Sequence, residues 1–293
     1  MKILVTGSKG QLGNSLSDTF DSLGIECFSF PRTELDIRDS KNVNAVVRKV
    51  KPNYIINTAA FTDVDRAESE AVECESVNSL GPRVLAEASL EHGCTLVQIS
   101  TDYVFDGKKG APYHEHDVRN PINTYGKSKA LGESNIEEVL KDNYYILRTS
   151  WLYSKYGKNF AKTMAKKALE SKETVRVVAD QFGQPTFAGD LSSQIHKMLD
   201  ESPAFGIYNA TNSGVATWFD FAQCIFEELG EDKNRVLPIS SSEFERAASR
   251  PQYSALADGK WIQSGLEPLP EWRKSVVENI HLIAESLQSL DNR

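Results

Sequence analysis

Residues 2–13 read KILVTGSKGQLG and combine a short apolar run with three regularly spaced glycines. The Ile, Leu and Val content of the run predicts a buried β-strand, and the residues after it have the pattern of an amphipathic helix. Gly7, Gly10 and Gly13 fit the turn between them, because glycine permits a tight turn, close approach of a pyrophosphate, and close packing of helix on strand. The start of a helix also favours anions. This stretch predicts a dinucleotide-binding βα unit.

The same alternation continues through the first half of the chain. The predicted strands are residues 2–6, 25–30, 54–58, 95–100 and 144–148, and the predicted helices are residues 11–23, 40–50, 71–92 and 125–140. Strands that alternate with helices form βαβ units with right-handed crossovers. We therefore predict an α/β fold of the Rossmann type, a doubly wound parallel sheet with helices on both faces.

The second half is less regular. It predicts helices at residues 159–171, 218–229 and 270–290, and strands at residues 174–179 and 206–211. We interpret residues 1–150 as an NAD(P)-binding domain. Residues 151–293 are predicted to be mainly a smaller C-terminal substrate-binding lobe, interleaved with returns to the main sheet.

Composition and charge exclude several classes of protein. The net charge of −8 argues against a nucleic-acid-binding surface, which would gather Lys and Arg. The four cysteines are widely spaced and form no CxxC pair, so neither zinc nor a disulfide framework is indicated. No apolar run approaches the ~20 residues of a membrane span, and the N-terminus has no signal-peptide pattern. We expect a cytoplasmic protein with no membrane partner.

Tyr125 and Lys129 form a YxxxK pattern at the start of the predicted helix 125–140. Positions i and i+4 share one face of a helix, so both side chains are expected at one site. Reduction of a carbonyl by hydride needs a proton donor at the developing alkoxide. A nearby ammonium and the positive nicotinamide ring are expected to lower the pKa of the Tyr125 phenol, and Lys129 can also hold the cofactor ribose. Thr101, at the end of the strand before, is expected to donate a hydrogen bond to the same carbonyl oxygen.

The second predicted strand bears on the choice of cofactor. A site for NAD usually places an acidic residue at the end of this strand. Here the strand ends at Phe30 with no acidic residue at its tip, and Arg32 follows as a candidate to bind a 2′-phosphate. This favours NADPH and leaves NADH possible. The alternative for Arg32 is a solvated loop residue.

Seven motifs along nearly the whole chain resemble those of dTDP-4-dehydrorhamnose reductases, members of the extended short-chain dehydrogenase/reductase superfamily. They are GSKGQLG (7–13), AAFTDVDRAE (59–68), STDYVFDG (100–107), YGKSK (125–129), RTSWLY (148–153), DQFGQPT (180–186) and RPQYS (250–254). The resemblance implies reduction of the C4 ketone of dTDP-4-dehydro-L-rhamnose by NAD(P)H, in nucleotide-sugar and cell-surface polysaccharide biosynthesis.

The resemblance also implies roles for particular residues. The implied catalytic residues are Thr101, Tyr125 and Lys129. The cofactor residues, including the glycine loop and Arg32 from the patterns above, are Gly7, Gly10, Gln11, Leu12, Gly13, Arg32, Asp36, Ile37, Ala60, Phe61, Thr62, Tyr125 and Lys129. The implied residues for the sugar nucleotide are Thr101, Asp102, Tyr103 and Trp151. For Trp151 a core aromatic is the alternative.

Two positions depart from the family pattern. Some relatives dimerise through Mg²⁺ held by glutamates, one of them in the first helix, where this chain has Asn14-Ser15-Leu16. We therefore predict no metal site and expect a monomer or a homodimer. Many relatives also have His where this chain has Phe61.

Three alternatives to the implied reaction have different sequence requirements. A reductase of another 4-keto sugar nucleotide would share these motifs. A dehydratase would carry an acid after Thr-Asp, where this chain has Tyr103. A non-catalytic subunit that resembles the regulatory subunit of methionine adenosyltransferase would not need an intact Thr101, Tyr125 and Lys129.

Overall fold

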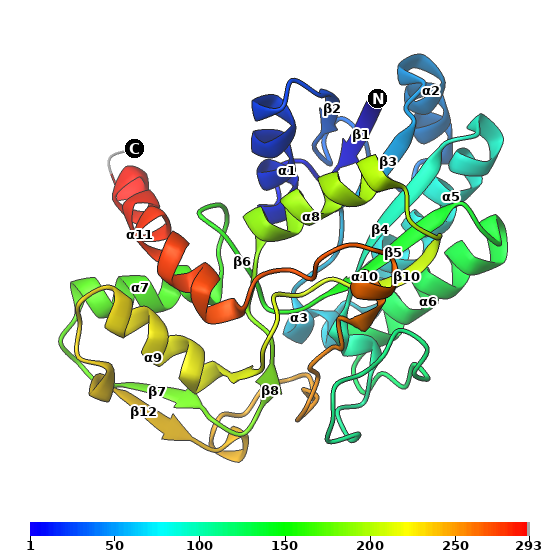
Figure 1. The fold of residues 1–293 in the computed structure, drawn as a ribbon. Helices are drawn as coiled ribbons and strands as arrows, with labels where there is room; N and C mark the ends of the chain where they lie inside the picture. Colours follow the sequence, from blue (N-terminus) through cyan, green and yellow to red (C-terminus); the bar gives the residue numbers. More distant parts are fainter. Residues whose placement is uncertain (292–293) are drawn as a thin grey trace.

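The computed structural model describes residues 1–291 and has a main β-sheet that includes the N-terminal strand (Figure 1). This sheet has six strands in the order β10-β5-β4-β3-β1-β2, and all neighbouring pairs are parallel. These strands are β1 (Lys2–Thr6), β2 (Glu26–Phe30), β3 (Tyr54–Asn57), β4 (Thr95–Thr101), β5 (Tyr144–Thr149) and β10 (Gly206–Asn209). The predicted doubly wound parallel sheet is confirmed. Its order reverses between β1 and β3, and open sheets bind ligands at the carboxyl ends of strands beside such a reversal.

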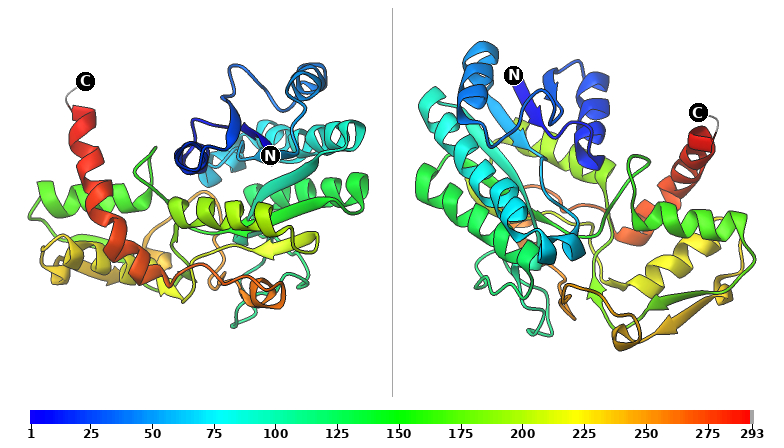
Figure 2. Two further views of the ribbon diagram at one scale, coloured as in Figure 1. Left: turned by 45° about the horizontal axis from the view of Figure 1, so that its top comes forward. Right: turned by 180° about the vertical axis from the view of Figure 1, so that it is seen from behind.

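Helices cover both faces of this sheet (Figures 1 and 2). They are α1 (Gln11–Ser22) and α8 (Ala188–Glu201) on one face, and α2 (Ser40–Val50), α5 (Gly81–His92) and α6 (Thr124–Leu140) on the other. Strand β1 contributes side chains to the apolar clusters on both faces of the sheet, because successive side chains of a strand point to opposite faces. Ile3 and Val5 pack in the cluster with α1 and α8, and Leu4 packs in the cluster with α2 and α5.

Besides the two clusters on the faces of the sheet, a separate apolar core, called the second cluster below, lies in the C-terminal half beside the sheet (Figures 1 and 2). It involves the parallel strands β7 (Val175–Val178) and β12 (Val236–Ile239) and the helices α7 (Phe160–Glu170), α9 (Trp218–Glu228) and α11 (Trp272–Asp291). Phe221 and Ile225 of α9 and Val276 and Ile280 of α11 are fully buried there. Strand β10 lies between these elements in sequence but pairs with β5 in the main sheet.

Short elements connect these layers. They are α3 (Val64–Ser69), α4 (Ala71–Glu75), the π-helix η1 (Ser76–Leu80), the 3₁₀ helices η2 (Asp102–Val104), η3 (Lys233–Arg235) and η4 (Ser241–Glu243), β6 (Leu152–Tyr153), β8 (Phe182–Gly183), β9 (Thr186–Phe187), β11 (Ala216–Thr217) and α10 (Gly259–Gln263).

The helical region 71–92, predicted as one α-helix, is divided into α4, η1 and α5. Asn78 in the π-helical turn donates to and accepts from the backbone of Phe61, and Pro82 in the first turn of α5 has no N–H to donate. Helices α3 and α8 and strand β12 are not among the predicted elements.

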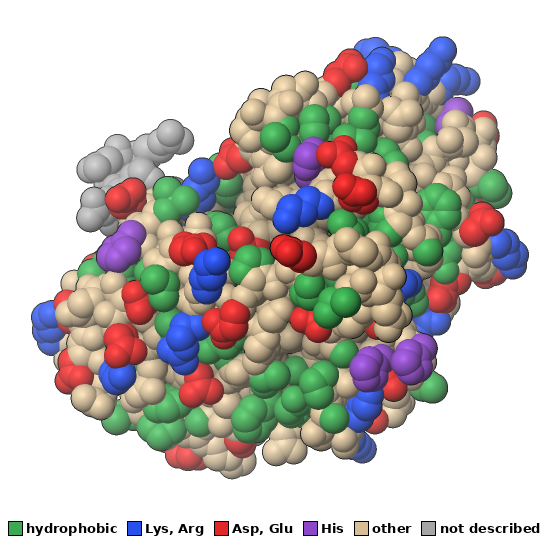
Figure 3. All heavy atoms as spheres, in the orientation of Figure 1, with side chains coloured by type: hydrophobic (Ala, Val, Ile, Leu, Met, Phe, Trp, Pro, Cys, Tyr) green, Lys and Arg blue, Asp and Glu red, His purple; other side chains and the backbone are tan. Residues whose placement is uncertain are grey.

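The surface mixes charges of both signs. Acidic and basic side chains are interspersed over most of the face drawn in Figure 3, in keeping with the net charge of −8. Among residues 1–291, no helix has both the length and the apolar character needed to span a bilayer.

Candidate active site

A cavity of about 1500 Å³ opens at the carboxyl ends of the central strands and reaches across to β7 and α7 of the second cluster. Its position is the one expected for a ligand of a doubly wound sheet. All predicted site residues except Gly13 line it, namely Gly7, Gly10, Gln11, Leu12, Arg32, Asp36, Ile37, Ala60, Phe61, Thr62, Thr101, Asp102, Tyr103, Tyr125, Lys129 and Trp151.

The glycine loop is packed too tightly for side chains at its two ends. A Cβ atom at Gly7, whose φ is +67°, would lie 2.6 Å from the backbone nitrogen of Ala59. A Cβ at Gly13 would lie 2.6 Å from the carbonyl oxygen of Gly7, so this glycine acts by packing behind the cavity. Gly10 precedes α1 as its N-cap and has no side chain to cap the first turn. The loop therefore presents bare backbone and the positive end of α1 to the cavity, which fits a pyrophosphate.

Tyr125 lies in the first turn of α6, at the inner end of the cavity. Asn123 caps this turn by accepting from the Gly126 N–H at 2.7 Å. Gly126 lets the helix approach closely, since a Cβ there would lie 2.2 Å from the Tyr103 carbonyl oxygen. The rings of Tyr103 and Tyr125 meet edge to face at 5.9 Å.

Burial raises the pKa of Tyr125 above its ordinary value, and a hydrogen bond with the Thr101 side chain acts in the opposite direction. The sequence predicted a lowered pKa through Lys129 and the positive nicotinamide ring together, whereas in the protein without cofactor the pKa is shifted in the opposite direction. The physical reason is that loss of hydration disfavours the phenolate more than the neighbouring dipoles favour it. A protonated phenol is the form that a proton donor requires.

Lys129 lies one turn after Tyr125 and is buried. Its ammonium donates to the Ile99 carbonyl oxygen at 2.6 Å. Burial lowers the pKa of Lys129 to about 8, and the charge of Glu133 works against this shift. Glu133 is itself buried behind the site and is paired with Arg148 at 2.7 Å.

Asp102 is a fully buried carboxyl group between Thr101 and the C-terminal segment. It accepts from the Thr101 hydroxyl at 3.0 Å and from the Ser254 hydroxyl at 2.5 Å. Burial raises the pKa of Asp102 to about 7, and the hydrogen bonds from Ser254 and Thr101 limit this rise. The RPQYS motif is thereby joined to the end of β4.

Trp151 projects from the end of β5 into the cavity. Its backbone has a φ of 45°, a conformation that is uncommon for a non-glycine residue. Its ring stacks on Trp218 of α9, with centroids 3.6 Å apart. Trp151 is partly exposed.

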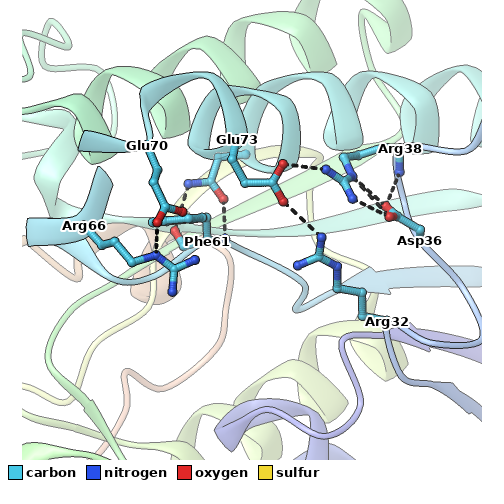
Figure 4. Close-up of polar contacts among 8 residues, drawn as sticks. Arg32, Asp36, Arg38, Phe61, Arg66, Glu70 and Glu73 are labelled. Carbon is cyan, nitrogen blue, oxygen red and sulfur yellow. Dashed lines mark hydrogen bonds and ion pairs between the residues drawn. The ribbon is translucent and has the colours of Figure 1, made fainter. Parts of the chain in front are cut away.

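The outer end of the cavity is charged. Arg32 donates to Glu73 at 3.0 Å, and its side chain is 66% exposed. Arg38 holds Asp36 through several hydrogen bonds, the shortest of 2.6 Å, which lower the pKa of Asp36 to about 2. Figure 4 shows both arginines directed at the carboxylate of Glu73.

Several further lining residues were not predicted. They include Trp218 and the basic residues Arg66, Lys158, Lys167, Arg176, Arg246 and Arg250. Arg250 forms bonds of 2.7 Å to both oxygens of Asp65 of α3. The RPQYS and AAFTDVDRAE motifs were signals for Arg250 and Arg66, but the others are scattered over the second half of the chain and belong to no motif.

The part of the chain that the structure describes brings together no group of three or more His, Cys, Asp and Glu side chains that could hold a metal ion. His114 and His116 stack on each other with ring centroids 5.5 Å apart.

Known proteins share this fold and sequence over almost the full chain. Residues 1–284 match the family model described as RmlD substrate binding domain. A dTDP-4-dehydrorhamnose reductase of Streptomyces griseus is 43% identical over 94% of this chain and 92% of that protein. A dTDP-4-keto-6-deoxy-D-glucose reductase of Streptomyces niveus is 39% identical, and the alignment covers 96% of each.

Solved structures agree with these sequence matches. The crystal structure of dTDP-4-dehydrorhamnose reductase from Bacillus anthracis, in complex with NADP, is 40% identical with a TM-score of 0.91. It covers 96% of this chain and 99% of that one. Identity at this level over nearly full length establishes common descent, and this chain belongs to the family of dTDP-4-dehydrorhamnose reductases.

Proposed function

We propose that this protein reduces the C4 ketone of dTDP-4-dehydro-L-rhamnose to dTDP-L-rhamnose with NADPH. One observation carries the proposal: a single cavity is lined both by the phosphate-suited glycine loop and by Thr101, Tyr125 and Lys129. Relatives named as reductases of dTDP-sugars, one of them with bound NADP, support this reaction.

The cofactor is NADPH, which supplies the hydride when bound, and NADH is a possible substitute. The backbone around Gly7 and Gly10 is suited to hold its pyrophosphate, since side chains at the loop ends would collide with backbone. Gln11, Leu12, Asp36, Ile37, Ala60, Phe61 and Thr62 are the further proposed contacts. Arg32 is proposed to meet the 2′-phosphate.

Tyr125 acts as the proton donor to the C4 oxygen. Its buried phenol is kept protonated, and the Thr101 side chain beside it favours the phenolate that forms when the proton leaves. In the free protein the Thr101 hydroxyl donates to Asp102, and we propose that it turns to donate to the C4 oxygen when the sugar nucleotide binds. Lys129, an ammonium below about pH 8, stabilises the phenolate after transfer and holds the cofactor ribose.

The sugar nucleotide is bound by residues of both halves of the chain. Asp102, Tyr103 and Trp151 are the proposed contacts of the deoxysugar, because they lie at the strand ends next to Thr101. In this scheme residues 1–150 bind NAD(P), and residues 151–293 mainly bind substrate. We further propose a cytoplasmic enzyme that acts as a monomer or homodimer.

Two other functions make different demands on the site. Reduction of another dTDP-4-keto sugar uses the same chemistry, and relatives named for other dTDP-keto sugars favour testing it. A regulatory subunit would have no need of the Tyr125 and Lys129 arrangement. Oxidation of NADPH, followed by absorbance with a panel of dTDP- and UDP-linked 4-keto sugars, separates these functions. We expect the fastest oxidation with dTDP-4-dehydro-L-rhamnose, and no oxidation with any member of the panel would contradict an enzymatic role.

A further inference from the structure

Four charged side chains form one cluster (Figure 4), and they are Arg32, Asp36, Arg38 and Glu73. Two of them, Arg32 and Asp36, line the cavity. Arg32 and Arg38 follow strand β2, and both reach Glu73 on α4. One carboxylate oxygen of Glu73 accepts from Arg32 at 3.0 Å, and the other accepts from Arg38 at 2.8 Å. A single carboxylate therefore bridges two arginines, which is the arrangement in which arginines hold an anion.

The members of the cluster differ in their freedom to turn to a ligand. Each nitrogen of the Arg38 guanidinium is engaged, two with Asp36 and one with Glu73. Arg32 uses one nitrogen for Glu73, is 66% exposed and lines the cavity. Arg32 is thus the cation that an incoming anion meets first.

The charges of the cluster cancel. Arg32 and Arg38 carry two positive charges, and Asp36 and Glu73 carry two negative ones, so an incoming phosphate finds no net attraction. Removal of the Glu73 charge would leave one uncompensated positive charge beside the cavity. Exposed ion pairs are weak, so Arg32 can exchange Glu73 for another anion.

We propose that Glu73 sets the cofactor preference of this protein by competing with the 2′-phosphate of NADPH for Arg32. The proposal rests on the proposed cofactor site, in which the adenosine ribose lies between the glycine loop and Asp36. NADH has a neutral hydroxyl at the same place and does not compete with Glu73. Glu73 therefore weakens the binding of NADPH but not that of NADH. The affinities of the two cofactors are closer to each other than they would be with Arg32 and Arg38 alone.

The test is calorimetric binding to the Glu73→Gln variant, with NADPH, NADH and adenosine 2′,5′-bisphosphate as ligands. Glutamine keeps the shape and removes the charge. The dissociation constants of NADPH and of the bisphosphate should fall about fivefold, the size of one exposed ion pair, while that of NADH stays the same. Glu87→Gln is the matched control, because Glu87 is likewise a helical glutamate paired with an arginine, Arg83, and does not line the cavity.

Two results would overturn the proposal. Equal affinities of Glu73→Gln and wild type for NADPH would show that no competition exists, and weaker binding of NADPH would show that Glu73 orients Arg32 for the phosphate instead. Arg32→Ala tests the site itself, and should weaken NADPH and the bisphosphate while it spares NADH. If Arg32→Ala has this effect and Glu73→Gln has none, the cofactor site stands and only the role of Glu73 fails. If Arg32→Ala affects both cofactors equally or neither, the proposed 2′-phosphate contact fails with it.

Discussion

At the scale of single residues, motifs in the sequence located the glycine loop and the proposed reacting groups in the cavity but could not give the partners of its charged groups. Thr101, Tyr125 and Lys129 stand in short motifs, and their side chains line one cavity. The partner of Arg32 is 41 residues away along the chain, and Ser254 is 152 residues from Asp102. Such contacts depend on how loops pack in three dimensions. The pKa of Tyr125 was misjudged for the same reason, since burial decides it and no motif states burial.

The pKa of Lys129 predicts how the activity depends on pH. The group is an ammonium below its pKa of about 8 and neutral above it. The wild-type kcat/KM should therefore fall as the pH rises through about 8, while burial keeps Tyr125 protonated over this range. Lys129→Met should lower both turnover and cofactor affinity.

The pH profile of Lys129→Met provides the control. Its descending limb near pH 8 should be absent, while any titration of Asp102 near pH 7 should remain in both proteins. An unchanged limb near pH 8 in the variant would assign that ionisation to another group.

At the scale of secondary-structure elements, the sequence was most informative where a clear hydrophobic periodicity follows a residue that can cap the start of a helix. The predicted helix 40–50 coincides with α2, whose N-cap Asp39 accepts from two backbone N–H groups. Helix α8 was overlooked, although Leu191, Ile195 and Met198 keep a helical spacing and are fully buried. The π-helical turn η1 could not be predicted, because it depends on bonds between Asn78 and the distant Phe61 backbone.

The glycine loop gives a prediction at this scale. The Cβ of Gly13→Ala would lie within 2.8 Å of three backbone atoms of Gly7 and Ser8, which cannot move without distorting the loop. Overpacking of this kind typically destabilises by about 1–3 kcal/mol, and NADPH affinity should fall as well. Thermal unfolding and calorimetric binding measure the two effects.

Gly259→Ala is the matched control for Gly13→Ala. A Cβ at Gly259 meets no atom within 4 Å, so stability and binding should stay close to wild type. If Gly13→Ala binds NADPH as tightly as this control does, the loop does not hold the pyrophosphate in the way proposed.

At the scale of the whole molecule, the cavity is completed by two parts of the chain that the sequence suggested as separate. Its lining combines the ends of β1, β3 and β4 with β7 and α7 of the second cluster. The return of β10 to the main sheet was anticipated from the interleaved pattern. The sequence did not reveal the stacking of Trp151 on Trp218, because no local pattern joins residues that follow different strands.

From the stacked pair of Trp151 and Trp218 we predict that Trp151 contributes to the affinity for the sugar nucleotide. Trp151→Ala removes the stacked ring on the sugar side of the cavity and should raise the KM for the sugar nucleotide, with NADPH affinity unchanged. Alanine occupies the same positive φ without adding strain relative to tryptophan. Trp151→Phe, which keeps an aromatic ring, should recover part of the affinity. Unfolding of Trp151→Ala in circular dichroism would instead give the residue a structural role.

The central claim is that Tyr125 delivers the proton to the C4 oxygen, and the turnover of Tyr125→Phe tests it most directly. Phenylalanine keeps the ring and its contact with Tyr103 but has no proton to give. Positioned acid catalysis contributes about 10²–10⁴-fold, so kcat for NADPH oxidation with dTDP-4-dehydro-L-rhamnose should fall by about this factor. Calorimetry should show unchanged NADPH binding in the same protein. A Tyr125→Phe variant with folded structure, bound NADPH and near-wild-type turnover would contradict the mechanism.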